Sequence, residues 1–433
     1  MNGTATLLIL LLLWVIPPSV ADTPPTVRVE LTVFPPEAEV TVISPAPAAG
    51  PAPAAPQWET SESGARRRIY SALPAGTLLR ISATGYETSV VHLPRENVPA
   101  VLTLEERLFP ADGPLRLFAE LPTGDGPKSV AFIPEGRVVV PLLWDRGIDV
   151  FDVSPGEIRH IERIEPPPDR AAAAGFVEPL SNASQGELWI SQMNGDRLHR
   201  FDLTSLRYRD SISASGQWPK VMETVSGADG RELLITSNWL SETVVFHDRL
   251  SGDLIHEVDM HGAPRGIAVV GDPQEVWVTE FSTGDIVIID PVSGAVRERL
   301  PLGPGAARHI VTHPRDERVY YSDMYHGTVS IIDGKTRELL RTRRLGSNIN
   351  TIAVDPRGRY LYVSERGRNN PENYHRPGPA FGRIFVVDAD TLEPVQTVWG
   401  RHQPTGLAVS EDGTLLAATD FLDDTLSIYT VAE

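Results

Sequence analysis

Short runs of alternating apolar and polar residues fill the chain from about residue 113 to its end, and they come in a repeating order. Within one copy, RGIAVVG, EVWVTEF, GDIVIID and AVRERLPL follow one another with polar breaks between them. This alternation, bounded by Gly, Pro, Asp and Ser, is typical of short β-strands. The pattern therefore predicts repeated units of four strands each.

An aspartate that follows the third run of each unit sets the register of the repeat. In four units a Ser or Thr stands three positions later, which is typical of a turn closed by the carboxylate. The aligned positions are Asp152, Asp202, Asp248, Asp290, Asp333 and Asp388, with Thr430 in the last unit. Seven strand-rich units with a period of roughly 40–50 residues predict an all-β, seven-bladed β-propeller.

The two ends of this region predict how the ring closes. The last unit stops after TLSIYTV and lacks a fourth strand, whereas PLRLFAELP, residues 114–122, precedes the first unit. We expect this early segment to complete the last blade, because closure removes the free sheet edges of the ring.

The repeats also resemble a known family. RYLYVSERG, ERVYYSDMYHGTVSIID and QEVWVTEFSTGDIVIID resemble the YVTN repeats of YncE-like and surface-layer seven-bladed propellers. The resemblance covers residues 113–433 and implies a propeller domain over 108–433. It implies no single function, since this fold carries binding proteins, dehydrogenase subunits and lactonases.

The region before the propeller has the pattern of a second, smaller β domain. VRVELTVFPPEAEVTVIS and the stretch at residues 66–93 alternate like half-buried strands, on either side of a Pro/Ala-rich loop at residues 44–56. These runs predict a β-sandwich over residues 22–107. LPAGTLLRISATGYETSVVHL resembles the PEGA domain, a secreted β module, which implies an accessory role or contact with a cell-envelope component.

The first residues, MNGTATLLILLLLWVIPPSVADT, predict a secretory signal peptide over residues 1–21. The apolar run is too short to span a bilayer comfortably, and small residues follow at Ser19 and Ala21. An uncleaved anchor is the alternative, since no Lys or Arg precedes the run. No later segment has the length and apolar character of a membrane span, so we expect a secreted, periplasmic or cell-envelope-associated protein.

Charge and cysteine content exclude several classes of chemistry. The formal net charge of −18 at pH 7 argues against a nucleic acid partner, because coating a polyanion needs positive charge. The chain has no cysteine, which excludes disulfides, thiol nucleophiles and thiolate metal sites. DGKT at residues 333–336 lacks the upstream glycine of a phosphate loop, and we expect neither a cofactor nor a metal.

Two columns of polar residues are expected on one rim of the ring, because the start of the first strand and the end of the second meet at the same edge of an antiparallel sheet. The first-strand column is Lys128, Lys220, Arg265, Arg308, Asn350 and Thr405, and the second unit, near Ala174, aligns poorly. The second-strand column is Leu142, Gln192, Asn238, Glu280, Asp323, Glu365 and Asp420.

An apolar column runs beside the acids, and histidines flank the cations. Its members are Met193, Trp239, Phe281, Met324 and Phe421; the histidines are His309 and His402. Apolar walls with a few convergent polar groups are typical of a small-molecule site. The candidate binding residues are Lys128, Lys220, Asn238, Trp239, Arg265, Glu280, Phe281, Arg308, His309, Asp323, Glu365 and Asp420.

Four interpretations of these residues stay open. Arg265 with Glu280, and Arg308 with Asp323, would be salt bridges that tie the blades together. The cations would bind an anion, since guanidinium forks suit carboxylate or phosphate. Glu280, His309 or Asp323 would be acid–base catalysts. The acidic column with its Asn would hold Ca²⁺, although the interleaved arginines oppose a cation.

The sixth unit carries an insertion, ERGRNNPENYHRPGPAFG at residues 365–382, on the same rim. It predicts a lid or a partner-docking loop with Tyr374 and His375, and a tolerated surface insertion is the alternative. We expect a non-enzymatic protein that binds an anionic small ligand or a protein partner at this rim.

Two other functions remain. A metal-free lactonase-type or isomerase-type enzyme would hold a carboxylate with Arg265 and Arg308 and move a proton with Glu280 or His309. A structural cell-envelope spacer would use the rim for neither purpose.

Overall fold

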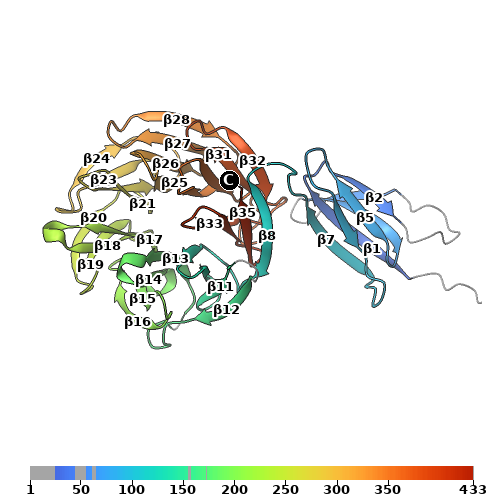
Figure 1. The fold of residues 1–433 in the computed structure, drawn as a ribbon, viewed down its shortest axis with the longest axis horizontal. Coiled ribbons are helices and arrows are strands. Elements are labelled where there is room, and N and C mark those ends of the chain that lie inside the picture. Colours follow the sequence, from blue (N-terminus) through green and yellow to red (C-terminus); the bar gives the residue numbers. More distant parts are fainter. Residues whose placement is uncertain (1–24, 44–54, 61–64, 155–157, 172, 433) are drawn as a thin grey trace, which may run out of the picture.

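The computed structural model describes residues 25–43, 55–60, 65–154, 158–171 and 173–432. The predicted signal peptide at residues 1–21 and most of the Pro/Ala-rich loop lie outside the described residues. The described chain is almost entirely β-structure. Figure 1 shows it as a ring of small sheets with a separate pair of sheets beside it.

The pair of sheets is the predicted β-sandwich. One sheet has the strand order β3-β4-β1-β7 and the other β2-β5-β6. The strands are β1 (Thr26–Phe34), β2 (Glu39–Ile43), β3 (Gln57–Thr60), β4 (Arg66–Pro74), β5 (Leu78–Ser82), β6 (Ser89–His92) and β7 (Val101–Arg107). Alternate residues of β1 and β5, such as Leu31 and Ile81, are fully buried in one shared core, as the period of two predicts.

The ring consists, within the described residues, of seven four-stranded antiparallel sheets. The innermost strands are β9 (Ala131–Ile133), β13 (Phe176–Asn182), β17 (Pro219–Ser226), β21 (Pro264–Val270), β25 (Ala307–Thr312), β29 (Ile349–Val354) and β33 (Pro404–Val409). The second strands are β10 (Arg137–Pro141), β14 (Glu187–Gln192), β18 (Glu232–Asn238), β22 (Glu275–Glu280), β26 (Arg318–Asp323), β30 (Tyr360–Glu365) and β34 (Leu415–Asp420).

The outer half of each blade holds the remaining strands. The third strands are β11 (Ile148–Asp152), β15 (Arg197–Asp202), β19 (Thr243–Asp248), β23 (Ile286–Ile289), β27 (Thr328–Asp333), β31 (Arg383–Asp388) and β35 (Thr425–Val431). The fourth strands are β12 (Arg159–Ile164), β16 (Tyr208–Ser213), β20 (Leu254–Asp259), β24 (Val296–Leu300), β28 (Leu339–Arg344), β32 (Pro394–Trp399) and, from before the first blade, β8 (Leu115–Pro122).

The ring closes as predicted. Strand β8 pairs antiparallel with β35, with Leu121 opposite Leu426, and completes the blade that the chain end leaves one strand short. Figure 1 shows β8 beside β35, far from it in sequence. The seven-bladed propeller preceded by a small β-sandwich is therefore confirmed.

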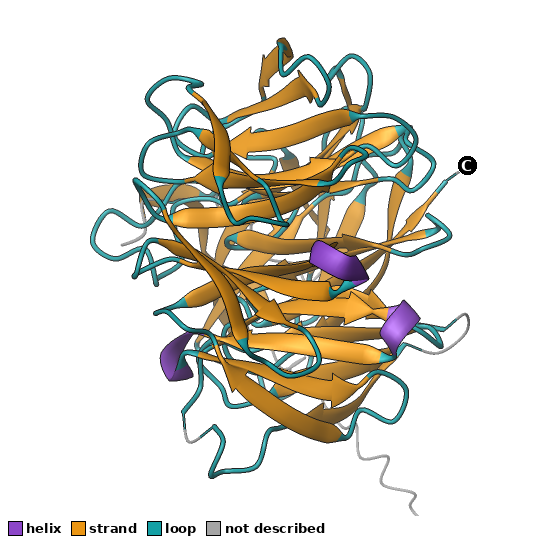
Figure 2. Ribbon diagram, turned by 90° about the vertical axis from the view of Figure 1, so that its left-hand side faces the viewer, coloured by secondary structure: helices purple, strands orange, loops and turns teal. Residues whose placement is uncertain are grey.

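Helical structure is limited in the described chain to three short 3₁₀ turns, Ala183–Gln185, Met193–Gly195 and Ala228–Gly230 (Figure 2). None of the described helices has the length and apolar character needed to cross a membrane.

A repeated hydroxyl fixes the backbone of the innermost strands. The first strand of most blades has a bulge near its start, and a Ser or Thr of the second strand accepts the bulged N–H, as Thr279 Oγ1 does from Gly266 N at 2.8 Å. The same bond joins Ser191 to Glu178, Ser322 to His309, Ser364 to Thr351 and Thr419 to Gly406. The residue just before each bulge is therefore held at the same place on the rim.

The sandwich contacts the propeller at the sixth blade. The Phe34 ring stacks on Phe381 with centroids 4.4 Å apart and lies 5.3 Å from Trp399. Arg107 donates to the Trp399 carbonyl at 3.1 Å and pairs with Glu120 of β8. Since Phe381 belongs to the insertion at 365–382, one loop contacts the sandwich and also reaches the rim.

Candidate functional site

The side chains of the second-strand column form ion pairs and hydrogen bonds within their own blades. Glu280 is fully buried at the end of β22, where it pairs with Arg299 of β24 at 2.9 Å and accepts the His261 N–H at 2.6 Å. Glu365 repeats this arrangement with Arg383 at 2.5 Å and the Ser347 N–H at 2.8 Å. These acids fasten the loop that enters each blade to the strands of that blade.

Asp323, Asp420 and Asn238 do the same work with other partners. Asp323 accepts the Ala306 N–H and pairs with His326 at 2.8 Å. Asp420 accepts the Arg401 N–H at 2.9 Å, and burial raises the pKa of its carboxyl to about 6. The Asn238 amide donates to the Ala214 carbonyl at 3.0 Å. The column is a structural series.

The cationic column, in contrast, converges. Lys128, Lys220, Arg265 and Arg308, each from a different blade, line one cavity of about 430 Å³ at the mouth of the ring. Arg366, which follows β30, joins them. The cavity volume is in the range of small-molecule sites.

One carboxylate stands among these five cations in the described chain. Glu178 of β13 pairs with Arg265 across the ring at 2.5 Å, and burial opposes its ionisation while Arg265 and Ser129 favour it, so its pKa lies below its usual value. Arg308 Nε donates to Asn350 and Arg366 to Gln403. Arg265 Nη1 and Arg366 Nε are buried donors without a partner in the described structure, which is unusual for native proteins.

Crowding of like charges shifts the proton affinity of the cluster. Burial, with Arg265 and Arg308 adding to it and Glu178 opposing it, lowers the pKa of Lys220 to about 7. Burial and the same arginines, with Arg366, hold the pKa of Lys128 well below its usual value. Burial lowers the pKa of Arg366 to about 10. An anion in the cavity would oppose the part of the Lys128 and Lys220 shifts that the neighbouring cations cause.

Aromatic side chains form the wall around the cations. Trp144, Trp218, Trp239 and Tyr374 line the cavity. The Trp218 ring lies 5.5 Å from Lys220 Nζ, and the Arg366 guanidinium lies 5.9 Å from the Tyr374 ring. The insertion therefore supplies part of this wall, and Gln403 holds it there through a 2.6 Å bond to the Tyr374 carbonyl.

Comparison with known proteins gives one relative at substantial identity. The chain is 34% identical over 369 residues to antigen Lp49 of Leptospira interrogans, an alignment that covers 81% of this chain and 77% of the relative. The chain belongs to the Lp49 family. No family model matches the chain, so the resemblances of this Lp49-family protein to YVTN repeats and to the PEGA module stay predictions.

Solved structures agree on the fold. A chain in the crystal structure of a mitotic checkpoint complex matches with a TM-score of 0.59 at 14% identity, over 75% of this chain and 95% of that one. At this identity the likeness concerns the fold alone.

The predicted site residues of this Lp49-family protein fall into two groups. Lys128, Lys220, Trp239, Arg265 and Arg308 line the cavity. Phe281 packs on Trp239 with centroids 4.9 Å apart, and His309 lies near Arg265 and Glu178 with its pKa lowered to about 4 by burial and Arg265. Asn238, Glu280, Asp323, Glu365 and Asp420 are turned into their own blades.

The expected pairs Arg265–Glu280 and Arg308–Asp323 were wrong. Glu280 pairs with Arg299 on the fourth strand of its blade, and Asp323 pairs with His326 in the turn that follows its own strand. Both acids also accept an N–H of the loop that enters their blade. Glu280 and Asp323 are not placed for the expected acid–base role, because neither lines the cavity in which a substrate would bind. The Ca²⁺ interpretation also fails for this column, since its members bond to different partners in separate blades.

Sequence reasoning missed Glu178, Arg366, Trp144 and Trp218. Glu178 was lost because the second unit was aligned near Ala174, whereas Val177 holds the column position. The bulge hydroxyl Ser191, which is equivalent to Thr279, was the available signal.

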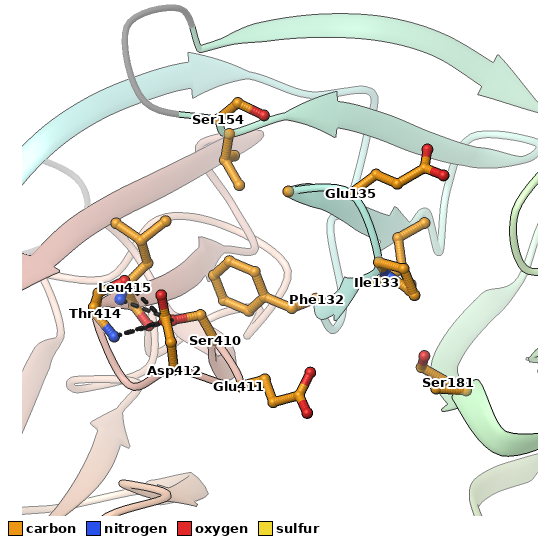
Figure 3. A pocket seen from close by; sticks show the side chains of 14 residues that line it. Phe132, Ile133, Glu135, Ser154, Ser181, Ser410, Glu411, Asp412, Thr414 and Leu415 are labelled. Atoms are coloured by element: carbon orange, nitrogen blue, oxygen red, sulfur yellow. Dashed lines mark hydrogen bonds between the residues drawn. The ribbon is translucent and has the colours of Figure 1, made fainter.

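A larger cavity, about 750 Å³, lies on the opposite rim between the first, second and seventh blades (Figure 3). Glu135, Glu411 and Asp412 line it, and no Lys or Arg does among the described residues. Its polar groups serve a local turn, where Ser410 Oγ donates to Asp412 at 2.6 Å. In the described chain no group of three His, Asp or Glu side chains is placed to hold a metal ion.

Proposed function

We propose that the rim cavity is a binding site for a small anionic ligand. The observation that carries the proposal is the convergence of Lys128, Lys220, Arg265, Arg308 and Arg366 on one cavity, with no Asp or Glu among the described residues that line it. Glu178, which pairs with Arg265, lies outside that lining. Clustered buried cations are costly in the free protein. A ligand that brings negative charge removes that cost, and the gain appears as affinity.

The walls restrict the ligand further. Guanidinium groups of Arg265, Arg308 and Arg366 suit the forked oxygens of carboxylate or phosphate. Trp144, Trp218, Trp239 and Tyr374 offer flat apolar surface for a ring or carbon skeleton. We therefore favour a compact ligand with at least two negative charges and an apolar body.

The same proposal places the protein outside the cytoplasm, as a secreted or cell-envelope binding protein. The leader-like first residues and the description of the Leptospira relative as an antigen support it. The contact of the sandwich with the cavity loop through Phe34 and Phe381 gives the sandwich an accessory part in this function.

Calorimetry with mono-, di- and tricarboxylates and organic phosphates tests the site. We expect dianions or trianions to bind to the wild type and to lose affinity in Arg308→Gln/Arg366→Gln. The matched control is Arg315→Gln, an exposed arginine outside the cavity, which should bind like the wild type. A ligand at 100 times its Kd should add about 2.7 kcal/mol to the free energy of unfolding. Absence of binding by every anion would contradict the proposal.

A further inference from the structure

The chain uses lysine in a very restricted way. Only three of its 39 Lys and Arg residues are lysines, namely Lys128, Lys220 and Lys335. Lys335 lies in an exposed turn and pairs with Glu317 at 2.9 Å. The other two line the rim cavity. Arginine forms nearly all the ion pairs elsewhere, so the cavity holds two of the three lysine amines of the chain, which burial can deprotonate far more readily than guanidinium groups.

Lys220 lacks the surroundings of a structural cation. Its Nζ atom lies beside the Met193 sulfur and 5.5 Å from the Trp218 ring. Its charged neighbours are Arg265 and Arg308, which repel the ammonium form, and Glu178, which favours it and already pairs with Arg265. No ion pair joins Lys220 to a carboxylate among the described residues.

These surroundings favour the neutral amine. Burial, with the two arginines, lowers the pKa of Lys220 to about 7, so a large share of Lys220 is unprotonated at neutral pH. A lysine desolvated in a pocket beside other cations is a nucleophile toward carbonyl carbon. The same arginines are placed to hold a carboxylate next to it.

We propose that Lys220 binds the carbonyl group of an oxo acid covalently, as a reversible imine, while Arg265 and Arg308 hold the carboxylate of that ligand. This inference rests on the proposed anion site and names the ligand class of the same cavity. The neutral amine adds to the carbonyl carbon and forms a C–N bond. Loss of the carbonyl oxygen as water, with the two amine protons, gives the C=N bond. No oxidant or reductant takes part.

Lys128 is the internal competitor, because it lines the same cavity. Its Nζ atom lies 4.2 Å from the centroid of the Phe421 ring, and a ring face at that distance stabilises the ammonium form. Burial and the neighbouring cations hold the pKa of Lys128 well below its usual value too. Arg366 is the charge that affects Lys128 most, whereas Arg265, one of the two arginines that would hold the carboxylate, is the charge that affects Lys220 most. The structure therefore assigns the imine to Lys220 and an electrostatic part to Lys128.

Borohydride trapping tests the assignment on the full-length protein. 2-Oxoglutarate is the probe, 2-hydroxyglutarate is the matched diacid without a ketone, and acetone is the matched ketone without an acid. After reduction with cyanoborohydride, peptide mass spectrometry should place the 2-oxoglutarate adduct on Lys220 at least tenfold above Lys335. Acetone should label Lys220 far less, because it lacks the carboxylate that the arginines hold.

The variants separate chemistry from charge. Lys220→Arg keeps a cation and should abolish the adduct, whereas calorimetry should still detect binding of 2-hydroxyglutarate. Lys128→Arg should keep the adduct on Lys220. Thermal unfolding checks that both variants are folded.

Each contrary outcome has its own meaning. An adduct on Lys128 in place of Lys220, or equal labelling of Lys335, overturns the assignment. Binding of 2-oxoglutarate and 2-hydroxyglutarate without any adduct overturns the imine and leaves the anion site standing. Failure of every carboxylate to bind defeats the anion site as well.

Discussion

The two charged columns of the rim stand side by side on the same blades, and the structure treats them in opposite ways. At the end of the second strand, Glu280 and Glu365 each have an arginine of their own blade and a backbone N–H. At the start of the first strand, Lys128, Lys220 and Arg308 face a shared cavity and no carboxylate pairs with them in the described chain. The acids of the second-strand column are all hydrogen-bonded or ion-paired within the protein. The cations of the first-strand column keep positive charge that a ligand could neutralise.

The difference shows how a repeat becomes a site. Satisfied charges stabilise each blade alone and can occur in every blade without conflict. Unsatisfied charges of one sign raise the free energy of the folded protein when several converge. A protein can keep such converging charges where a bound ligand supplies the opposite charge. Cations without a partner in the protein therefore indicate a binding site.

The largest expected effect comes from breaking the second-strand column. Glu280→Ala would leave Arg299 without its carboxylate and the His261 N–H without its acceptor, in a place where Glu280 is fully buried. We expect a loss of roughly 3 kcal/mol in the free energy of unfolding, measured by urea titration. The affinity for anions should stay within a few fold. A large loss of affinity in a still folded variant would contradict the structural role.

A substitution in the first-strand cationic column should lower anion affinity and leave stability nearly unchanged. Arg308→Gln removes a guanidinium from the cavity, and we expect the affinity for a dianion to fall about 30-fold, or about 2 kcal/mol. Calorimetry at fixed ionic strength measures it. Stability without ligand should change little, because the lost bond to Asn350 is offset by relief of repulsion. An equal loss of stability and affinity would place Arg308 in the structural column.

The fold and the cations could be predicted because each rests on a repeat. The aspartate turns, such as Asp333 with the Thr336 N–H at 2.8 Å, recur often enough to give the period. Lys220 and Arg308 occupy the position before the strand bulge, so aligned units place them at one rim. Local alternation and a fixed register were sufficient for this part.

The charge partners could not be predicted from the two columns. Arg299 and Arg383 lie 19 and 18 positions after the acids they bind, in outer strands that the alignment of inner strands ignores. Glu178 was hidden because its unit departs from the others before the strand. Arg366 and Tyr374 come from an insertion, whose path no period constrains. Each miss reflects tertiary contacts outside the repeat.

A smaller effect tests whether the converging cations cost stability. Lys128→Gln removes an ammonium whose pKa burial and the neighbouring arginines depress. In the absence of anions, we expect the free energy of unfolding to rise by about 1–2 kcal/mol. Urea titration in a buffer without multivalent anions measures it, with Lys335→Gln as the control. A loss of stability would show that the cluster has a counter-charge in the free protein.

The smallest effect concerns pH. The folded pKa of Lys220 is lowered to about 7, so the cavity has one more positive charge below that value and loses it as the pH rises. Affinity for a dianion should therefore fall about threefold from about pH 6.5 to about pH 8.5. Calorimetry at several pH values measures this. Anion binding should be accompanied by proton uptake at Lys220 near and above pH 7, and by none well below it.

Other titrating groups allow a sharper version of this test. Burial raises the pKa of Glu223 on the same strand to about 7, so its ionisation would lower anion affinity in the same pH range. Lys220→Arg should flatten the profile, whereas Glu223→Gln should leave it intact if the lysine is the source. His309, with its pKa lowered to about 4, is neutral throughout. If Glu223→Gln flattens the profile and Lys220→Arg does not, Glu223 is the group that titrates. Lys220 would then stay positively charged over this pH range, like the arginines around it.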